Sequence, residues 1–366
     1  MRTIHLKLSH HAYDIQVGCE VREALGTVIR GLGEGVRGIV VTDEHVIANQ
    51  KETLCGILGL EGVVAEPHVI RPGDQSKSMD ELARLWDRLG AEKIARDGFI
   101  LGVGGGVVSD LGAFAAATWM RGVRWVAVPT TLEAMIDASI GGKTGINTAH
   151  GKNMVGAFWH PTAVLNDLSF LETLPTREYA AGLAESIKHA LIVDAAFLEW
   201  HEKNADAILS HDRDVVEELV ARNCAIKARV VMADEREERG VRECLNFGHT
   251  VGHAIEKAAE YSLRHGECVG LGMLAACRIS AARGMIGEDL EGRVRTLLER
   301  FGLPTKMPGE ISKERVLELI GSDKKARGRR VRFVLLDGVG KWKLVGDVID
   351  EEIQAGIEAP KMGGRP

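Results

Sequence analysis

The sequence predicts a two-domain protein: an α/β Rossmann-like N-terminal domain with a mostly parallel sheet over residues 1–174, and a mainly α-helical C-terminal domain over residues 175–366. Its 366 residues exceed the roughly 250–300 residues at which single hydrophobic cores stop growing. Short apolar segments alternate with helical ones in the first half, as βαβ units do. Long helical periodicity dominates after Pro175.

The first half supplies the predicted strands. Residues 1–18 alternate apolar and polar side chains and predict two strands, and further strands are expected at 36–41, 63–70, 99–103 and 123–128. Helices are expected over 79–89 and 107–118. Ligands of such sheets bind at the carboxyl ends of the strands, where this sequence places Asp43, Asp74, Gly104–Gly106 and the pair Thr130 and Thr131.

The second half predicts helices over 177–202, 212–237, 248–259, 266–284 and 290–301, with a late strand pair at 331–336 and 341–345.

Composition excludes several classes of function. A formal net charge of −6 gives no general attraction to nucleic acid or anionic membranes, so an anionic ligand needs a local basic cluster. No apolar run approaches the ~20 residues of a membrane span. The six cysteines are scattered without a Cys-x-x-Cys pair, which is typical of reduced thiols in a cytoplasmic protein.

A glycine-rich segment, Gly-Val-Gly-Gly-Gly-Val-Val-Ser-Asp, runs from Gly102 to Asp110 between a predicted strand and a predicted helix. Backbone amides at such a helix start can hold a diphosphate. The segment departs from the dinucleotide fingerprint, because Val107 stands at the third glycine position. A tight strand-to-helix turn explains these glycines equally well. Asp43 can accept hydrogen bonds from ribose hydroxyls or cap a helix, and both alternatives stay open.

Lys143 and Lys152 lie in a glycine-rich, otherwise apolar segment, with Arg121 upstream. Their neighbours are glycine, threonine and asparagine instead of alternating charges. This environment favours an anion pocket over a solvated surface.

His249 and His253 are four residues apart, so a helix places both on one face, and His265 follows as a possible third zinc ligand. Two surface histidines on an ordinary helix are the alternative. Glycines at 248, 252 and 266 favour the metal hypothesis, because they suggest close approach of another group to the backbone.

Glu185 and Lys188 share one face of a largely apolar helix, which makes Glu185 a possible oxygen ligand beside the histidines. Arg242 and Asn246 are four residues apart, one turn before His249, and can point toward whatever the metal holds.

Together these segments resemble the 3-dehydroquinate synthases, a family of sugar-phosphate cyclases. The matching strings include Val-Pro-Thr-Thr-Leu, Asp-Ala-Ser-Ile-Gly-Gly-Lys-Thr-Gly-Ile-Asn, Gly-Lys-Asn-Met-Val-Gly-Ala-Phe, Ala-Gly-Leu-Ala-Glu-Ser-Ile-Lys, and Asn-Phe-Gly-His-Thr-Val-Gly-His-Ala-Ile-Glu with His-Gly-Glu. They follow the family's order over nearly the whole chain. One departure is Asp74, where the family usually has glutamate.

The resemblance implies a cytoplasmic homodimer that uses NAD and one divalent metal, zinc or cobalt. It implies Glu185, His249 and His265 as the metal ligands and moves His253 from the metal to the substrate phosphate. The other implied substrate-pocket residues are Arg121, Asp137, Lys143, Asn153, Lys188, Lys227, Arg242, Asn246 and Lys324, with Lys325 as the alternative to Lys324. The implied NAD contacts are Asp43, Gly73, Asp74, Gln75, Lys77, Gly105, Gly106, Val107, Ser109, Asp110, Thr130, Thr131, Lys143, Lys152, Phe170, Leu171 and Thr173.

The implied reaction converts 3-deoxy-D-arabino-heptulosonate 7-phosphate to 3-dehydroquinate and phosphate, with NAD regenerated in every cycle. An iron-type polyol or alcohol dehydrogenase is one alternative, although it needs no phosphate pocket. A cyclase of sedoheptulose 7-phosphate and a non-catalytic binding protein are the others.

Overall fold

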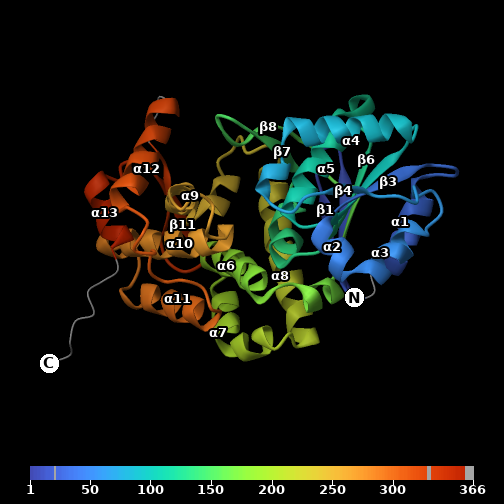
Figure 1. Ribbon diagram of the computed structural model, residues 1–366. Coiled ribbons are helices and arrows are strands. Elements are labelled where there is room, and N and C mark those ends of the chain that lie inside the picture. Colours follow the sequence, from blue (N-terminus) through green and yellow to red (C-terminus); the bar gives the residue numbers. More distant parts are fainter. Residues whose placement is uncertain (20–21, 328–330, 359–366) are drawn as a thin grey trace. The chain divides into compact units, whose positions relative to one another are not determined.

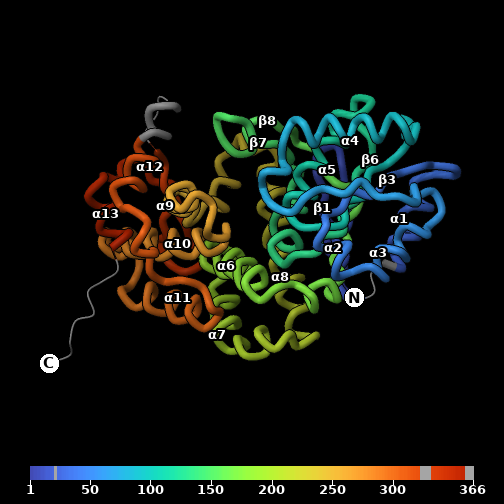
Figure 2. The backbone as a smooth tube through the Cα atoms, viewed as in Figure 1, coloured from blue at the N-terminus to red at the C-terminus, as the bar shows by residue number. Residues whose placement is uncertain are grey.

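The computed structural model describes residues 1–19, 22–327 and 331–358, without the side chains of residues 22 and 322–327. The chain forms two compact units: unit 1 comprises Met1–Pro175 and Arg213–Arg236, and unit 2 comprises Thr176–Asp212 and Glu237–Pro366. Figure 2 traces the chain, which crosses between the units three times. The expected ranges 1–174 and 175–366 differ from these units in one main segment, because helix α8 (Arg213–Ala233) packs on strands of unit 1.

Unit 1 is built on a seven-stranded sheet in the order β1-β2-β9-β6-β5-β3-β4 (Figure 1). Every neighbouring pair is parallel except β1 with β2. The central strands β3, β5 and β6 are buried along nearly their whole length, as parallel strands covered on both faces are. The strands are β1 (Arg2–Lys7), β2 (Ala12–Gly18), β3 (Gly38–Asp43), β4 (His68–Ile70), β5 (Phe99–Gly104), β6 (Arg124–Pro129) and β9 (Ala163–Asp167).

Helices and one hairpin complete unit 1. Helix α5 packs on β5, β6 and the hairpin of β7 and β8, while α8 packs on β1 and β2. The elements are α1 (Arg22–Leu32), α2 (Glu44–Asn49), α3 (Lys51–Leu58), α4 (Met79–Ala91), α5 (Gly106–Thr118), β7 (Lys143–Thr148) and β8 (Gly151–Phe158), with short helical turns η1 (Asp74–Ser76), η2 (Trp119–Arg121), η3 (Ala134–Ala138) and η4 (Leu168–Thr173).

Unit 2 is mainly helical and is organised around α10 (His265–Ala282), which packs against α6, α9, α11, α13 and β10. Almost every side chain of α10 from residue 266 to 280 is buried, because the helix is apolar on all sides. The other elements are α6 (Thr176–Val193), α7 (Ala195–Leu209), η5 (Arg242–Asn246), α9 (His249–Ala258), α11 (Asp289–Arg300), α12 (Lys313–Arg327), α13 (Asp350–Ile357) and the antiparallel pair β10 (Phe333–Leu336) and β11 (Trp342–Val345).

The predicted fold class and the late strand pair are confirmed. The single helix expected over 177–202 is wrong, because Asp194 caps a new helix by accepting a hydrogen bond from the Phe197 amide. Strand β9 and the hairpin of β7 and β8 were not predicted. The strand expected at 63–70 is reduced to His68–Ile70.

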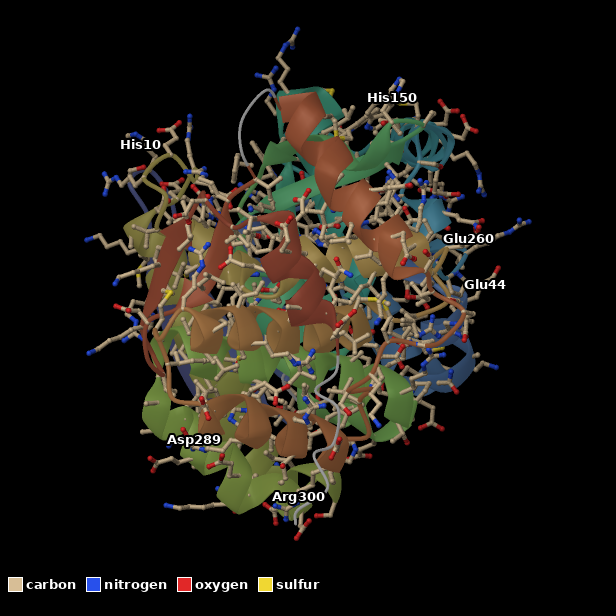
Figure 3. All side chains as sticks on the ribbon, turned by 90° about the vertical axis from the view of Figure 1, so that its left-hand side faces the viewer. His10, Glu44, His150, Glu260, Asp289 and Arg300 are labelled. Atoms are coloured by element: carbon tan, nitrogen blue, oxygen red, sulfur yellow. The ribbon has the colours of Figure 1, made fainter. Side chains whose placement is uncertain are left out.

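Charged side chains project outward from the ribbons, among them Glu44, Glu260, Asp289 and Arg300 (Figure 3). Within the described residues, no helix combines the length and the apolar character needed to cross a membrane.

Candidate functional site

Three helices of unit 2 bring together the carboxylate and the histidines singled out in the sequence. Glu185 and Lys188 come from α6, His249 and His253 from the start of α9, and His265 is the first residue of α10. The ligand atoms of the three histidines all lie within 4.8 Å of one another. Both histidine sets proposed from the sequence therefore remain geometrically possible.

Glu185 faces two of the histidines. Its Oε1 lies 3.6 Å from His249 Nε2 and 3.5 Å from His265 Nε2, while its Oε2 forms an ion pair with Lys188. A carboxylate oxygen and two imidazole nitrogens thus converge on one point. This is the oxygen and nitrogen donor set of a three-ligand catalytic zinc site.

In both His249 and His265, the ring nitrogen that faces away from Glu185 lies near an acceptor. His249 Nδ1 lies 3.2 Å from the backbone oxygen of Phe247, and His265 Nδ1 lies 3.6 Å from Glu256 Oε2. A carbonyl accepts hydrogen bonds but cannot donate them, so the His249 proton belongs on Nδ1. Its Nε2 lone pair is then left for a metal, which is how metal-binding histidines are usually oriented.

The charge states also suit a cation. Burial by itself would raise the pKa of Glu185, but the positive charge of Lys188, the largest opposing influence, holds that pKa well below its ordinary value. Burial, followed by the positive charge of Lys188, lowers the pKa of His249 well below its ordinary value. At neutral pH this pair is therefore a carboxylate and a neutral imidazole, the forms that bind metals.

Two glycines allow these helices to approach so closely. A Cβ on Gly266 would lie 2.0 Å from the backbone oxygen of Ala181, which is one turn before Glu185 on α6. A Cβ on Gly272 would lie 1.9 Å from the backbone oxygen of Gly248. The group expected near the glycine backbone is thus a neighbouring helix. These glycines therefore allow the helices to assemble the histidine cluster.

Four other residues expected at this site come from η5 and α12. Arg242, only 2% exposed, and the exposed Asn246 belong to η5, which ends three residues before His249. Lys324 and Lys325 lie on α12, but their side chains fall outside the described residues.

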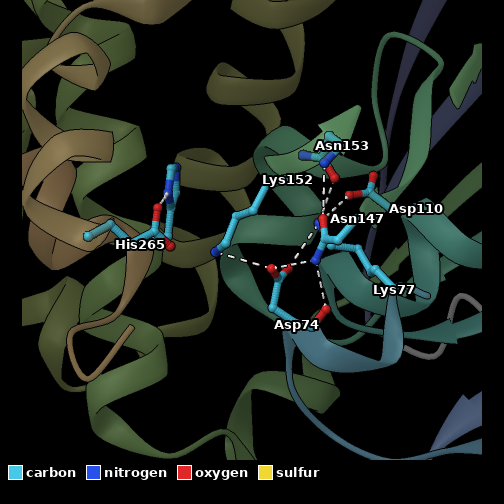
Figure 4. A network of polar contacts seen from close by, with 8 residues as sticks. Asp74, Lys77, Asp110, Asn147, Lys152, Asn153 and His265 are labelled. Atoms are coloured by element: carbon cyan, nitrogen blue, oxygen red, sulfur yellow. Dashed lines mark hydrogen bonds and ion pairs between the residues drawn. The ribbon is translucent and has the colours of Figure 1, made fainter. Parts of the chain in front are cut away.

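A second polar cluster lies in unit 1 and centres on Lys77 (Figure 4). Its Nζ lies 3.0 Å from an oxygen of Asp74 and 3.0 Å from Asp110 Oδ2, and donates to Asn153 Oδ1 at 2.9 Å. Burial opposes the charged form of Lys77, but Asp110 and Asp74 outweigh it and raise the lysine pKa. Burial raises the pKa of Asp110.

Asp74 links this cluster to the hairpin of β7 and β8. Its Oδ2 lies 3.1 Å from Lys152 Nζ and accepts a hydrogen bond from Asn147 Nδ2 at 2.8 Å. Burial would raise the Asp74 pKa, but Lys77 and Lys152 outweigh it and lower the pKa. Asn147 was not among the expected site residues, and only the unpredicted hairpin could have revealed it.

In the glycine-rich segment, some positions have no room for a side chain, whereas others do. A Cβ on Gly104 would lie 2.4 Å from Val108 Cγ2, so the fold requires glycine there. A Cβ on Gly106 would lie 3.6 Å from Ala138 Cβ, an ordinary contact. Gly105 caps α5 without a side-chain hydrogen bond, so the first amides of the helix are not satisfied by a capping side chain. An anion can bind such a helix start.

Other expected NAD contacts have structural roles. Asp43 caps α2, accepting hydrogen bonds from the His45 and Val46 amides at 2.8 and 3.0 Å, as one of its two alternatives anticipated. Phe170 and Leu171 are core residues, so only their backbone can meet a ligand. Thr173 Oγ1 accepts a hydrogen bond from Gln50 Nε2 at 2.6 Å.

The remaining expected residues are distributed over several helices, strands and loops of unit 1. Lys227 on α8 donates to Asp137 Oδ1 at 2.5 Å, and the exposed Arg121 has a φ of 67°. Gly73 precedes η1, Gln75 lies in η1, Val107 and Ser109 lie in the first turn of α5, Thr130 and Thr131 follow β6, and the exposed Lys143 begins β7.

Comparison with known proteins decides the family. The model of the 3-dehydroquinate synthase N-terminal domain matches residues 67–181, and that of the C-terminal domain matches residues 182–326. The chain belongs to the 3-dehydroquinate synthase family. A curated 3-dehydroquinate synthase of Caulobacter vibrioides is 43% identical over 355 residues, which cover 95% of this chain and 96% of that protein.

Two solved structures extend the comparison. The 2-epi-5-epi-valiolone synthase of Streptomyces hygroscopicus subsp. jinggangensis, with NAD+ and Zn2+ bound, is 28% identical, with a TM-score of 0.86 and 98% of both chains covered. A 2-deoxy-scyllo-inosose synthase complexed with carbaglucose-6-phosphate, NAD+ and Co2+ is 26% identical, with a TM-score of 0.87, covering 97% of this chain and 99% of that one.

Proposed function

We propose that this protein is a 3-dehydroquinate synthase, which converts 3-deoxy-D-arabino-heptulosonate 7-phosphate to 3-dehydroquinate and phosphate. Family membership supports this activity, and the structural observation that carries it is the convergence of Glu185 Oε1 with the Nε2 atoms of His249 and His265. These donors fit one divalent metal, zinc or cobalt, because both histidines have an acceptor beside Nδ1.

The two units have different tasks in this proposal. In unit 2, Glu185, His249 and His265 hold the metal, which when bound lowers the pKa of a substrate hydroxyl as it does that of water. In unit 1, the start of α5 binds the diphosphate of NAD, which supplies the hydride acceptor. The same unit contains the charged cluster in which Asp74 pairs with Lys77 and Lys152.

Cationic and neutral donors are needed where phosphate leaves. We assign this task to Lys188, Arg242, Asn246 and His253 of unit 2, because donors aimed at a leaving oxygen stabilise the charge that develops there. The rest of the substrate is proposed to be bound by six further residues: Arg121, Asp137, Lys143, Asn153, Lys227 and Lys324. We propose that the protein works in the cytoplasm. We also propose that it forms a homodimer, which light scattering of the purified protein tests by measuring its molar mass.

The activity is tested by supplying the heptulosonate phosphate with far less NAD than substrate. We expect many phosphates released per NAD, with 3-dehydroquinate identified by NMR and no accumulation of NADH at 340 nm. A dehydrogenase, the main alternative, would stop after one NADH per NAD and release no phosphate. Sedoheptulose 7-phosphate in place of the heptulosonate distinguishes the other cyclase, and a protein inactive on both substrates contradicts the proposal.

A further inference from the structure

The histidines of the proposed metal centre are supported in two different ways. His249 has a backbone acceptor, the Phe247 carbonyl, two residues before it in the chain. His265 has a side-chain acceptor, Glu256, which belongs to a different helix. Only the second of these supports depends on the identity of a side chain.

Glu256 is placed to act on His265 from the side opposite to the metal. It lies on α9 seven residues after His249, which is two helical turns, and it is only 7% exposed. Its Oε2 is 3.6 Å from His265 Nδ1, while His265 Nε2 is 3.5 Å from Glu185 Oε1. The imidazole thus lies between two carboxylates, one at each ring nitrogen.

This arrangement has a defined chemical consequence. An ionised carboxylate only accepts hydrogen bonds, so Glu256 favours the tautomer of His265 that carries its proton on Nδ1. The 3.6 Å separation is in the range of an ion pair, and a side-chain adjustment of about 0.7 Å would make it a hydrogen bond. A carboxylate at this position also makes the imidazole a more basic ligand.

We propose that Glu256 is a positioning residue of the metal centre, which holds His265 in the orientation and tautomer needed for Nε2 to bind the metal. The proposal rests on the metal centre assigned under the proposed function. It adds a residue that acts through His265 and was not among the site residues expected from the sequence. Helix α9 thus supplies one proposed ligand, His249, and through Glu256 it also supports another, His265.

Three substitutions test this role. Glu256→Gln keeps the shape and an accepting oxygen but removes the charge. Glu256→Leu removes both. The control Glu260→Gln removes the same charge from an exposed site just beyond α9 (Figure 3). For each protein, zinc affinity is measured by competition with a chromophoric chelator, the ligand field by the visible absorption of bound Co2+, and the stability of the metal-free form by urea unfolding.

We expect zinc affinity to fall about 10- to 100-fold in Glu256→Leu and by less in Glu256→Gln, with an altered Co2+ spectrum, whereas the control matches the wild type. If Glu256→Leu does not fold, the nearly isosteric Glu256→Gln decides. Zinc affinity within twofold of the wild type and an unchanged Co2+ spectrum would overturn the inference, even if urea stability falls. A wild-type protein that binds no zinc or cobalt would instead remove the proposed metal centre itself.

Discussion

Replacing Gly266 with alanine should move the proposed metal ligands apart while leaving each of them in the chain. Gly266 follows His265 at the start of α10, and an added Cβ would lie 2.0 Å from the Ala181 oxygen and 2.6 Å from its carbonyl carbon. Ordinary contact begins near 3.4 Å, so the start of α10 has to move away from α6 by roughly 1.4 Å. Backbone forms this contact on the α6 side, so no flexible side chain can relieve it.

The size of this displacement determines the expected effect. Metal–ligand distances tolerate deviations of about 0.2 Å, so a shift of more than 1 Å takes His265 out of reach of a metal held by Glu185 and His249. Zinc affinity should therefore fall at least about tenfold, which corresponds to ~1.4 kcal/mol. Forcing a methyl group into this contact should also lower the free energy of unfolding by about 1–3 kcal/mol.

Isothermal titration with zinc and urea unfolding of the metal-free protein measure the two effects separately. Gly292→Ala is the matched control, because Gly292 lies within α11 and an added Cβ there meets nothing within 4 Å. That control should keep full zinc affinity and be as stable as the wild type or more so. Wild-type zinc affinity in folded Gly266→Ala would show that this helix contact does not set the ligand geometry.

Three further predictions concern other parts of the molecule. Gly106→Ala should remain folded but weaken NAD binding in a fluorescence titration, whereas Gly104→Ala should destabilise unit 1; equal NAD affinity in wild type and Gly106→Ala would place the diphosphate elsewhere. Burial lowers the pKa of His68 below its ordinary 6.5 despite its contact with Glu81. Just below pH 6.5, His68 is therefore protonated in the unfolded chain but still neutral in the folded protein. The stability from this site is therefore present above pH 6.5 and is lost as the pH falls below it; urea unfolding of wild type and His68→Gln should diverge in pH slope there, and parallel slopes would contradict this sign. Arg242→Ala should slow phosphate release at least roughly tenfold while NAD still binds, and an unchanged rate would remove Arg242 from the phosphate site.

The fold was predictable where the sequence pattern of a single segment is enough to identify its secondary structure. Strands β3, β5 and β6 each contain a run of apolar residues, and their burial on both faces follows from that pattern. Asp194, by contrast, divides α6 from α7 inside a stretch with continuous helical periodicity. The grouping of α8 with unit 1 depends on its packing against β1 and β2, which helical periodicity does not specify.

The candidate site shows the same limit. Spacing on one helix singled out His249 and His253, because residues four apart share a helix face. The approach of Glu185 to His249, and of Glu256 to His265, depends on how separate helices pack together. Likewise, Asn147 reaches Asp74 only because the segment after Lys143 folds into a hairpin.

In the proposed metal centre, Glu185, and not His253, completes the ligand set with His249 and His265. Anomalous diffraction at the zinc edge, from crystals of the zinc-loaded protein, would locate the metal among these side chains. We expect one peak about 2.0–2.2 Å from a carboxylate oxygen of Glu185 and from the Nε2 atoms of His249 and His265. A peak bound by all three histidines with Glu185 outside its coordination shell would contradict it, as would the absence of zinc from this cluster.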